Sequence, residues 1–91
     1  MFKNLEELIS VIRQRKRFST EKSYTHKLLN NQKLSVEKVK EEIAELIGAI
    51  EKNTNKVHEA ADVLYHLMVL LEANDIKIED VMDELKKRQK K

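Results

Sequence analysis

The sequence predicts an all-α fold, a small helical bundle built around an antiparallel helix hairpin. Its 91 residues include one Gly and no Pro, the two residues that turns favour and helix interiors avoid. Apolar residues recur every three or four positions in several segments, as on one face of a helix. Aromatic residues make up only 4% of the chain, so Leu, Ile, Val and Ala must build the core. A chain of this length forms a single domain, residues 1–91.

The first helix is predicted to begin at Asn4, which can serve as its N-cap, and to end at about Lys16. Glu7 follows Asn4 by three residues, as in a capping box. The basic run "RQRKR" (13–17) ends this helix. Residues 18–35 are expected to form a loop, a short helix and a second loop.

Two long helices follow and form the predicted hairpin. Ser35 can cap a helix over residues 36–52, and "NTN" (53–55) turns the chain into a second helix over residues 56–73. The expected core stripe of the first of these helices consists of Val36, Val39, Ile43, Leu46, Ile47 and Ile50.

The helix over residues 56–73 is apolar around almost its whole circumference, so it must be covered on most sides. A last helix is expected over residues 78–88, and the tail (87–91) is expected to fray. So short a chain has few helices to cover the apolar one. We therefore expect a homodimer, in which helices of two copies complete the bundle.

Two acid pairs stand on opposite sides of the "NTN" turn. Glu42 and Glu45 are three residues apart, and Glu59 and Asp62 repeat that spacing in the next helix. At 1.5 Å per residue, Glu45 and Glu59 both lie about 6–8 Å from the turn, so the pairs can face one space. Converging carboxylates repel, and Mg²⁺ or Mn²⁺ would resolve that repulsion, since both prefer oxygen ligands. We expect these four acids to bind metal.

Ordinary structural roles compete with this interpretation. Glu41 and Glu59 could be surface acids paired with neighbouring lysines. His66 shares a helical stripe with Glu59 and Asp62, where it could contact substrate or could simply be a core or interface histidine. Asp62 is harder to explain structurally, because apolar residues flank it in "AADVLYHL".

Bound Mg²⁺ screens phosphate charge and lowers the pKa of a bound water, and a spare carboxylate can then take the proton. The predicted chemistry is hydrolysis of a phosphoanhydride. The basic run (13–17), which includes Arg13, offers cations for phosphate, although such residues also suit a helix C-terminus. Further candidate donors are Ser23, Tyr24, Thr25 and Lys27. There is no glycine-rich phosphate loop, which excludes Walker-type chemistry.

Glu-x-x-Glu followed after thirteen residues by Glu-x-x-Asp resembles the pattern of the MazG-like all-α nucleoside triphosphate pyrophosphatases. Four stretches together resemble the phosphoribosyl-ATP pyrophosphatase family of histidine biosynthesis: "SYTHKLL" (23–29), "KVKEEIAEL" (38–46), "EAADVLYHLMVLL" (59–71) and "IEDVMDELKKR" (78–88). The resemblance covers nearly the whole chain. It implies a dimeric, Mg²⁺-dependent enzyme that hydrolyses the α–β phosphoanhydride of phosphoribosyl-ATP to phosphoribosyl-AMP and pyrophosphate.

The resemblance also implies residue roles. The metal ligands would be Glu42, Glu45, Glu59 and Asp62, and Glu41 would be a further ligand or the water-activating base, which makes Glu41, Glu42 and Glu45 the catalytic set. Substrate would be bound by Ser23, Tyr24, Thr25 and Lys27, with Arg13 and His66 added from the residue patterns. The chain departs from the family at Lys40 and at Asn31–Gln32, where glycine is common.

Two other functions stay open. One is a related housecleaning pyrophosphatase acting on another nucleoside or deoxynucleoside triphosphate, and the other is a non-catalytic helical dimer. The net charge of +2 gives no argument for nucleic-acid binding. The longest apolar run, 67–71, is far too short to span a membrane. The absence of cysteine suits a reducing cytoplasm, where we expect the protein to work.

Overall fold

The structure is a computed structural model that describes residues 2–18 and 23–89. These residues form five helices and no strand, which confirms the all-α class. The helices are α1 (Lys3–Arg17), α2 (Tyr24–Leu29), α3 (Gln32–Lys52), α4 (Lys56–Ala73) and α5 (Ile78–Arg88). None of them is both long enough and apolar enough to cross a lipid bilayer.

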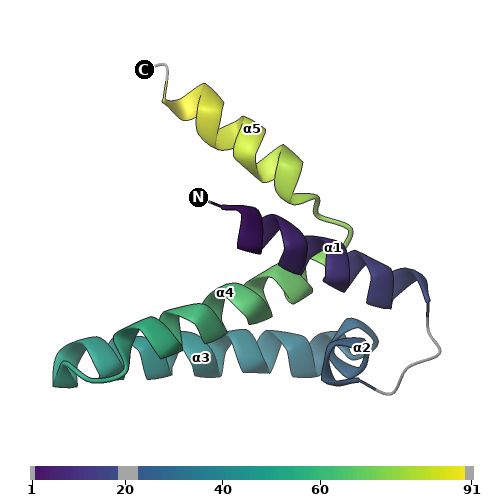
Figure 1. Cartoon of the computed structure of the whole chain (residues 1–91). Coiled ribbons are helices and arrows are strands. Elements are labelled where there is room, and N and C mark those ends of the chain that lie inside the picture. The colour runs from purple at the N-terminus through teal and green to yellow at the C-terminus, as the bar shows by residue number, and fades with distance from the viewer. Residues whose placement is uncertain (1, 19–22, 90–91) are drawn as a thin grey trace.

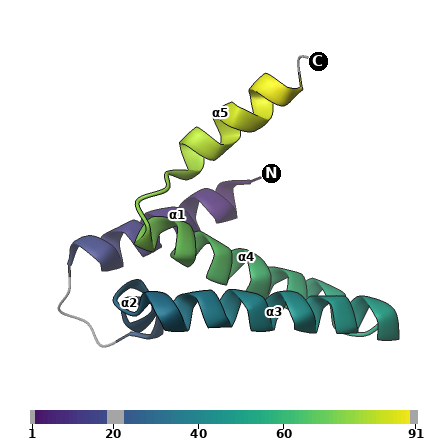
Figure 2. The same cartoon turned by 180° about the vertical axis from the view of Figure 1, so that it is seen from behind.

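The predicted hairpin is present, because α3 and α4 run antiparallel and pack against each other (Figure 1). α1 crosses α4 near the C-terminal end of α4, and α2 lies at the start of α3 (Figure 2). The core lies where α1, α2 and α4 meet. It consists of Ile9, Ile12, Leu28, Met68 and Val69.

The turn between α3 and α4 uses asparagine where many proteins use glycine. Asn53 and Asn55 have φ values of 58° and 46°, in the left-handed region that asparagine tolerates better than most residues. The Thr54 amide donates to the Ala49 carbonyl at 3.0 Å, which is the bond of a Schellman motif. This tight turn folds α4 directly back along α3.

Two predicted helix caps were wrong. α1 begins at Lys3, so Asn4 lies within the helix. α3 begins a full turn earlier than predicted, because the Asn31 side chain accepts a hydrogen bond from the Leu34 amide at 3.1 Å. Ser35 is therefore buried inside the helix and does not cap it. An asparagine one turn upstream offers the same capping chemistry and allows a longer helix.

The predicted tail and loop fall partly outside the described residues. Residue 1, residues 19–22 of the first predicted loop and residues 90–91 of the tail lie there. The described part of the tail begins in a helix, since α5 continues through Lys87 to Arg88.

The expected core stripe of α3 is only partly covered. Val39 is buried, but three isoleucines of the stripe are exposed, and α4 also exposes apolar side chains. The exposed residues are Ile43, Ile47, Ile50, Val57 and Leu64. The described residues of one chain cover the side of the hairpin that faces α1 and α2, and they leave these five apolar side chains open to solvent.

Candidate active site

Acidic side chains from α3 and α4 come together beside the hairpin turn. Glu42, Glu45 and Glu59 each place a carboxylate oxygen within 4.8 Å of the other two. Asp62 follows Glu59 by one helical turn, and its negative charge acts on Glu42. The antiparallel hairpin therefore brings both predicted acid pairs to one place, which we call the acid cluster (Glu42, Glu45, Glu59 and Asp62).

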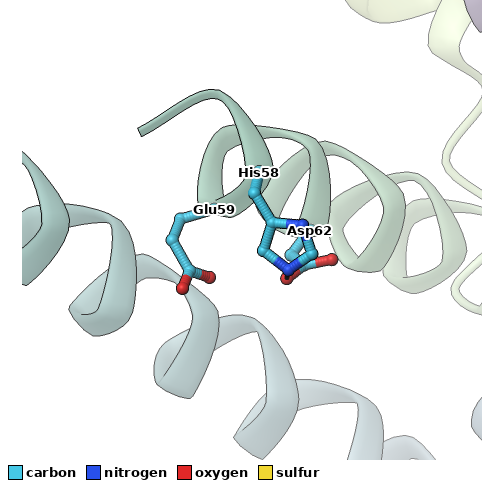
Figure 3. A group of neighbouring side chains, drawn as sticks. All are labelled: His58, Glu59 and Asp62. Carbon is cyan, nitrogen blue, oxygen red and sulfur yellow. Dashed lines mark ion pairs between the residues drawn. The ribbon is translucent and has the colours of Figure 1, made fainter. Parts of the chain in front are cut away.

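His58 joins the α4 side of the acid cluster. Its imidazole, the Glu59 carboxylate and the Asp62 carboxylate project from the first turns of α4 on the side that faces α3 (Figure 3). One ligand atom of each lies within 4.8 Å of the others, and His58 Nε2 is 3.4 Å from Asp62 Oδ2. His58 is exposed, and its i,i+4 spacing to Asp62 is the signal in the sequence that could have identified it.

Glu42 is the buried member of the cluster, with only 9% of its surface exposed. Its Oε2 atom is buried and makes no hydrogen bond. Burial raises the pKa of this carboxyl, and contact with Glu45 and the charge of Asp62 raise it further. A buried carboxylate oxygen without a partner is costly. Because the surrounding groups are carboxylates as well, a hard divalent cation is the partner that fits this donor set.

Glu41 and Lys38 lie at the edge of the acid cluster. Lys38 Nζ is 3.4 Å from Glu41 Oε2, and this carboxylate raises the pKa of Lys38. Glu41 belongs to neither group of converging ligand atoms. The surface ion pair considered from the sequence is therefore present, and it leaves Glu41 exposed next to the cluster.

Tyr24 and His66 connect α2 to the acid cluster. The Tyr24 hydroxyl is 2.9 Å from His66 Nε2, and His66 Nδ1 is 2.8 Å from the backbone oxygen of Asp62. Partial burial raises the pKa of Tyr24, while the positive charge of Lys38 opposes that shift. The structure thus places two of the predicted substrate-binding residues beside the predicted metal ligands.

The other α2 candidates have different surroundings. Ser23 caps α2, since its hydroxyl accepts a hydrogen bond from the His26 amide at 3.1 Å. Thr25 forms a short hydrogen bond with the Tyr65 hydroxyl, a contact that the sequence did not indicate. Lys27 is exposed.

Arg13 is held in another part of the molecule. Its Nε donates to Glu72 at 2.8 Å, and its two terminal nitrogens donate to Glu79 at 2.9 and 2.6 Å. These carboxylates, Glu79 foremost, raise the pKa of Arg13. Glu72 lies ten residues beyond Asp62 and thus about 15 Å further along α4. The structure does not bring Arg13 to the acid cluster.

Lys16 adds to the same network, since its ammonium donates to Asp75 at 2.6 Å. We call this region the ionic junction (Arg13, Lys16, Glu72, Asp75 and Glu79). It borders a cavity of about 540 Å³ where α1, the end of α4 and the start of α5 meet. The lining residues are Arg13, Lys16, Arg17, Glu72, Asp75, Lys77 and Glu79.

Comparison with known proteins gives a consistent family. Residues 5–89 match the family model of phosphoribosyl-ATP pyrophosphohydrolase. The phosphoribosyl-ATP pyrophosphatase of Clostridium novyi is 45% identical over 96% of this chain and 82% of its own length. The protein of that name from Methanococcoides burtonii is 42% identical over 92% of this chain and 90% of its own.

A longer relative matches as well. The histidine biosynthesis bifunctional protein HisIE of Pyrococcus furiosus is 44% identical over 94% of this chain, which spans only 41% of that protein. The family match extends over nearly all the described residues and includes both acid pairs of the cluster. The chain therefore belongs to the phosphoribosyl-ATP pyrophosphohydrolase family.

Proposed function

We propose that this chain hydrolyses phosphoribosyl-ATP to phosphoribosyl-AMP and pyrophosphate in histidine biosynthesis. Water breaks the phosphoanhydride between the α- and β-phosphates: one phosphorus takes the oxygen of the water, and the other phosphate leaves with the bridging oxygen. The proposal is supported by relatives with this name that are 42–45% identical over most of their length. The observation that carries it in the structure is the buried, unpartnered Glu42 oxygen within a cluster of carboxylates.

The acid cluster is the proposed Mg²⁺ site, and Mn²⁺ is a plausible substitute because it favours the same oxygen ligands. When bound, Mg²⁺ would screen the substrate phosphates and lower the pKa of a coordinated water. Glu42, Glu45, Glu59 and Asp62 would hold the ion. Glu41 lies beside this set but outside it, so its exposed carboxylate is the proposed acceptor of the water proton.

The structure supports a contact with substrate for only some of the candidate residues. Tyr24 and His66 lie beside the acid cluster and are well placed to contact substrate. The substrate roles of Ser23, Thr25 and Lys27 stay predictions. The role of Arg13 also stays a prediction, and its ion pairs at the ionic junction give it a structural alternative.

We also propose that a second copy covers the exposed apolar residues of the hairpin, giving a homodimer of single-domain chains in the cytoplasm. Support comes from the exposed apolar side chains on α3 and α4, which a monomer would leave in water. Light scattering of the purified protein measures its mass directly. Ile47→Glu, at the centre of the exposed α3 stripe, should convert a dimer into monomers.

The decisive experiment is release of pyrophosphate from phosphoribosyl-ATP, measured with Mg²⁺ and again with excess chelator. A panel of ordinary and deoxynucleoside triphosphates runs in parallel. Glu59→Gln should abolish release, and Glu37→Gln, an exposed acid of α3 outside the acid cluster, is the matched control. Release from another nucleotide alone would replace the proposed substrate. Chelator-insensitive release would contradict the metal site.

A further inference from the structure

The imidazole of His66 is fixed by contacts on several sides. Its Nδ1 lies 2.8 Å from the backbone oxygen of Asp62. The ring meets Tyr24 and Tyr65 edge-on, with centroids 5.7 and 5.0 Å apart, and the residue is buried. Because a backbone carbonyl only accepts hydrogen bonds, Nδ1 must carry the ring hydrogen.

This tautomer decides the direction of the next hydrogen bond. In the neutral ring Nε2 has no hydrogen, so it must accept from the Tyr24 hydroxyl at 2.9 Å. While the ring is neutral, the single hydrogen of that hydroxyl is directed toward His66. The lone pairs of the Tyr24 oxygen are left for other partners, and they can only accept.

Charged groups in and around the acid cluster act on the Tyr24 oxygen. Lys38 has the largest effect, followed by Glu42 of the cluster and Glu41 at its edge. A deprotonated phosphate oxygen has no hydrogen to donate, so it cannot bind to the lone pairs of the Tyr24 oxygen. The matching ligand is a hydrogen-bond donor, and hydrolysis of a nucleotide would bring two kinds of O–H donor to this place, a water and the hydroxyl groups of the sugar. This is the reverse of the donor role that the sequence suggested for Tyr24.

We propose that His66 is a positioning residue that fixes the Tyr24 hydroxyl as a hydrogen-bond acceptor beside the acid cluster, where it holds an O–H group. The identity of that O–H group rests on the proposed function: it is the water consumed in hydrolysis or a ribose hydroxyl of the substrate. The His66–Tyr24 geometry itself is a property of the chain alone.

The first test needs no substrate and no metal. Imidazole nitrogen chemical shifts of labelled protein are recorded in mildly alkaline buffer, below the ordinary pKa of a tyrosine hydroxyl. His66 should show a protonated Nδ1 and a bare, hydrogen-bonded Nε2. Tyr24→Phe should shift the Nε2 signal, and Tyr65→Phe, which alters the neighbouring ring but not the Nε2 partner, should leave it in place. A protonated Nε2 would overturn the proposal.

The second test asks whether His66 acts through Tyr24. Loss of one hydrogen bond in the site predicts that Tyr24→Phe lowers kcat/KM roughly tenfold. His66→Leu should cost about the same, and the double variant should be no worse than Tyr24→Phe alone. His66→Gln, whose amide oxygen can accept the hydroxyl, should lose less. Multiplicative losses in the double variant would overturn the proposal.

The split between kcat and KM identifies the O–H group. A lower kcat for Tyr24→Phe assigns the hydrolytic water, and a higher KM assigns a ribose hydroxyl. If the wild-type chain had no activity, the proposed function would fail, while the nitrogen shifts would still decide the His66–Tyr24 arrangement.

Discussion

Glu42 on α3 and Glu72 on α4 are buried to the same extent, with 9% and 8% of their surfaces exposed, yet their surroundings are opposite. Glu72 accepts a hydrogen bond from Arg13 at 2.8 Å. Glu42 has an oxygen with no hydrogen bond, and carboxylates surround it. Burial therefore does not distinguish a structural acid from a functional one, whereas the sign of the neighbouring charges does.

The difference extends to the two regions around these residues. The ionic junction combines cations and anions from α1, α4 and α5, so its charges are satisfied within the chain. The acid cluster gathers charges of one sign from α3 and α4. Such a cluster costs stability in the metal-free protein and is retained when something outside the chain uses it. Substitutions in the two regions should accordingly have opposite consequences.

The largest effect is expected at the acid cluster, on activity. Glu42→Gln should lower Mg²⁺-dependent kcat by about a hundredfold or more, since even groups that only support metal ligands cost 10–100-fold when lost. The same change should leave the metal-free protein as stable as before or more stable, because it removes a buried, repelled charge. Pyrophosphate release and urea unfolding measure the two effects, with Glu37→Gln as control. Loss of both activity and stability would make Glu42 a structural residue.

At the ionic junction the expected effect is on stability. Arg13→Met should lower the free energy of unfolding by about 2 kcal/mol, because Glu72 is left buried without its partner. The figure lies below that for fully buried pairs, since about a third of the Arg13 side chain is exposed. Adding Glu72→Met should recover much of the loss. Lys3→Met, an exposed cation on the same helix, is the control. A loss of stability that Glu72→Met does not recover would show that Arg13 stabilises the fold by packing alone.

The free energy of unfolding should depend on pH in opposite directions in the two regions. Hydrogen bonding to Arg13 lowers the pKa of Glu79 from 4.5 to about 2. A depressed folded-state pKa gives stability that is present above pH 4.5 and is lost as the pH falls toward 2. Burial raises the pKa of Glu42, so its contribution is full below pH 4.5 and is lost as the pH rises.

Urea midpoints recorded from neutral pH down to pH 2 test both signs. Glu79→Gln should flatten the acid limb of the profile, and Glu42→Gln should remove the decline toward neutral pH. An unchanged acid limb in Glu79→Gln would mean that the ion pair contributes nothing in solution.

The smallest effects are expected at two turns, one near each region. Asn53 and Asp75 both have φ of 58°, where glycine is unstrained. Asn53→Gly should stabilise the chain by a few tenths of a kcal/mol. Asp75→Gly relieves the same strain but removes the ion pair with Lys16, so its net effect should be smaller or reversed. Equal gains in thermal unfolding would show that the Lys16–Asp75 pair has no net value.

The sequence alone predicted the features that depend on the spacing of apolar and acidic residues along one helix. The limits of α4 and α5 agree with the prediction, and a spacing of three residues placed the acid pairs correctly on both arms of the hairpin. The start of α3 was missed because Asn31 and Ser35 are both good caps, and local chemistry does not choose between them.

Features that join distant parts of the chain gave no local signal. Arg13 and Glu72 are 59 residues apart, so nothing near Arg13 in the sequence indicated a buried partner. The pairing of Tyr24 with His66 across 42 residues depends on α2 packing against α4. The exposure of Ile43 and Ile47 could not be read from the apolar stripe, because a periodic stripe does not state which chain covers it.

α5 is attached differently from the other helices. None of its residues is buried, and it extends away from the hairpin beside α1 (Figure 1). The ion pair between Arg13 and Glu79 connects α5 to α1. Amide hydrogens in α5 should therefore exchange with solvent before those of α3 and α4, through an opening that leaves the acid cluster intact. The chain would then have two cooperative units, and the one bearing the proposed metal site would be the last to open.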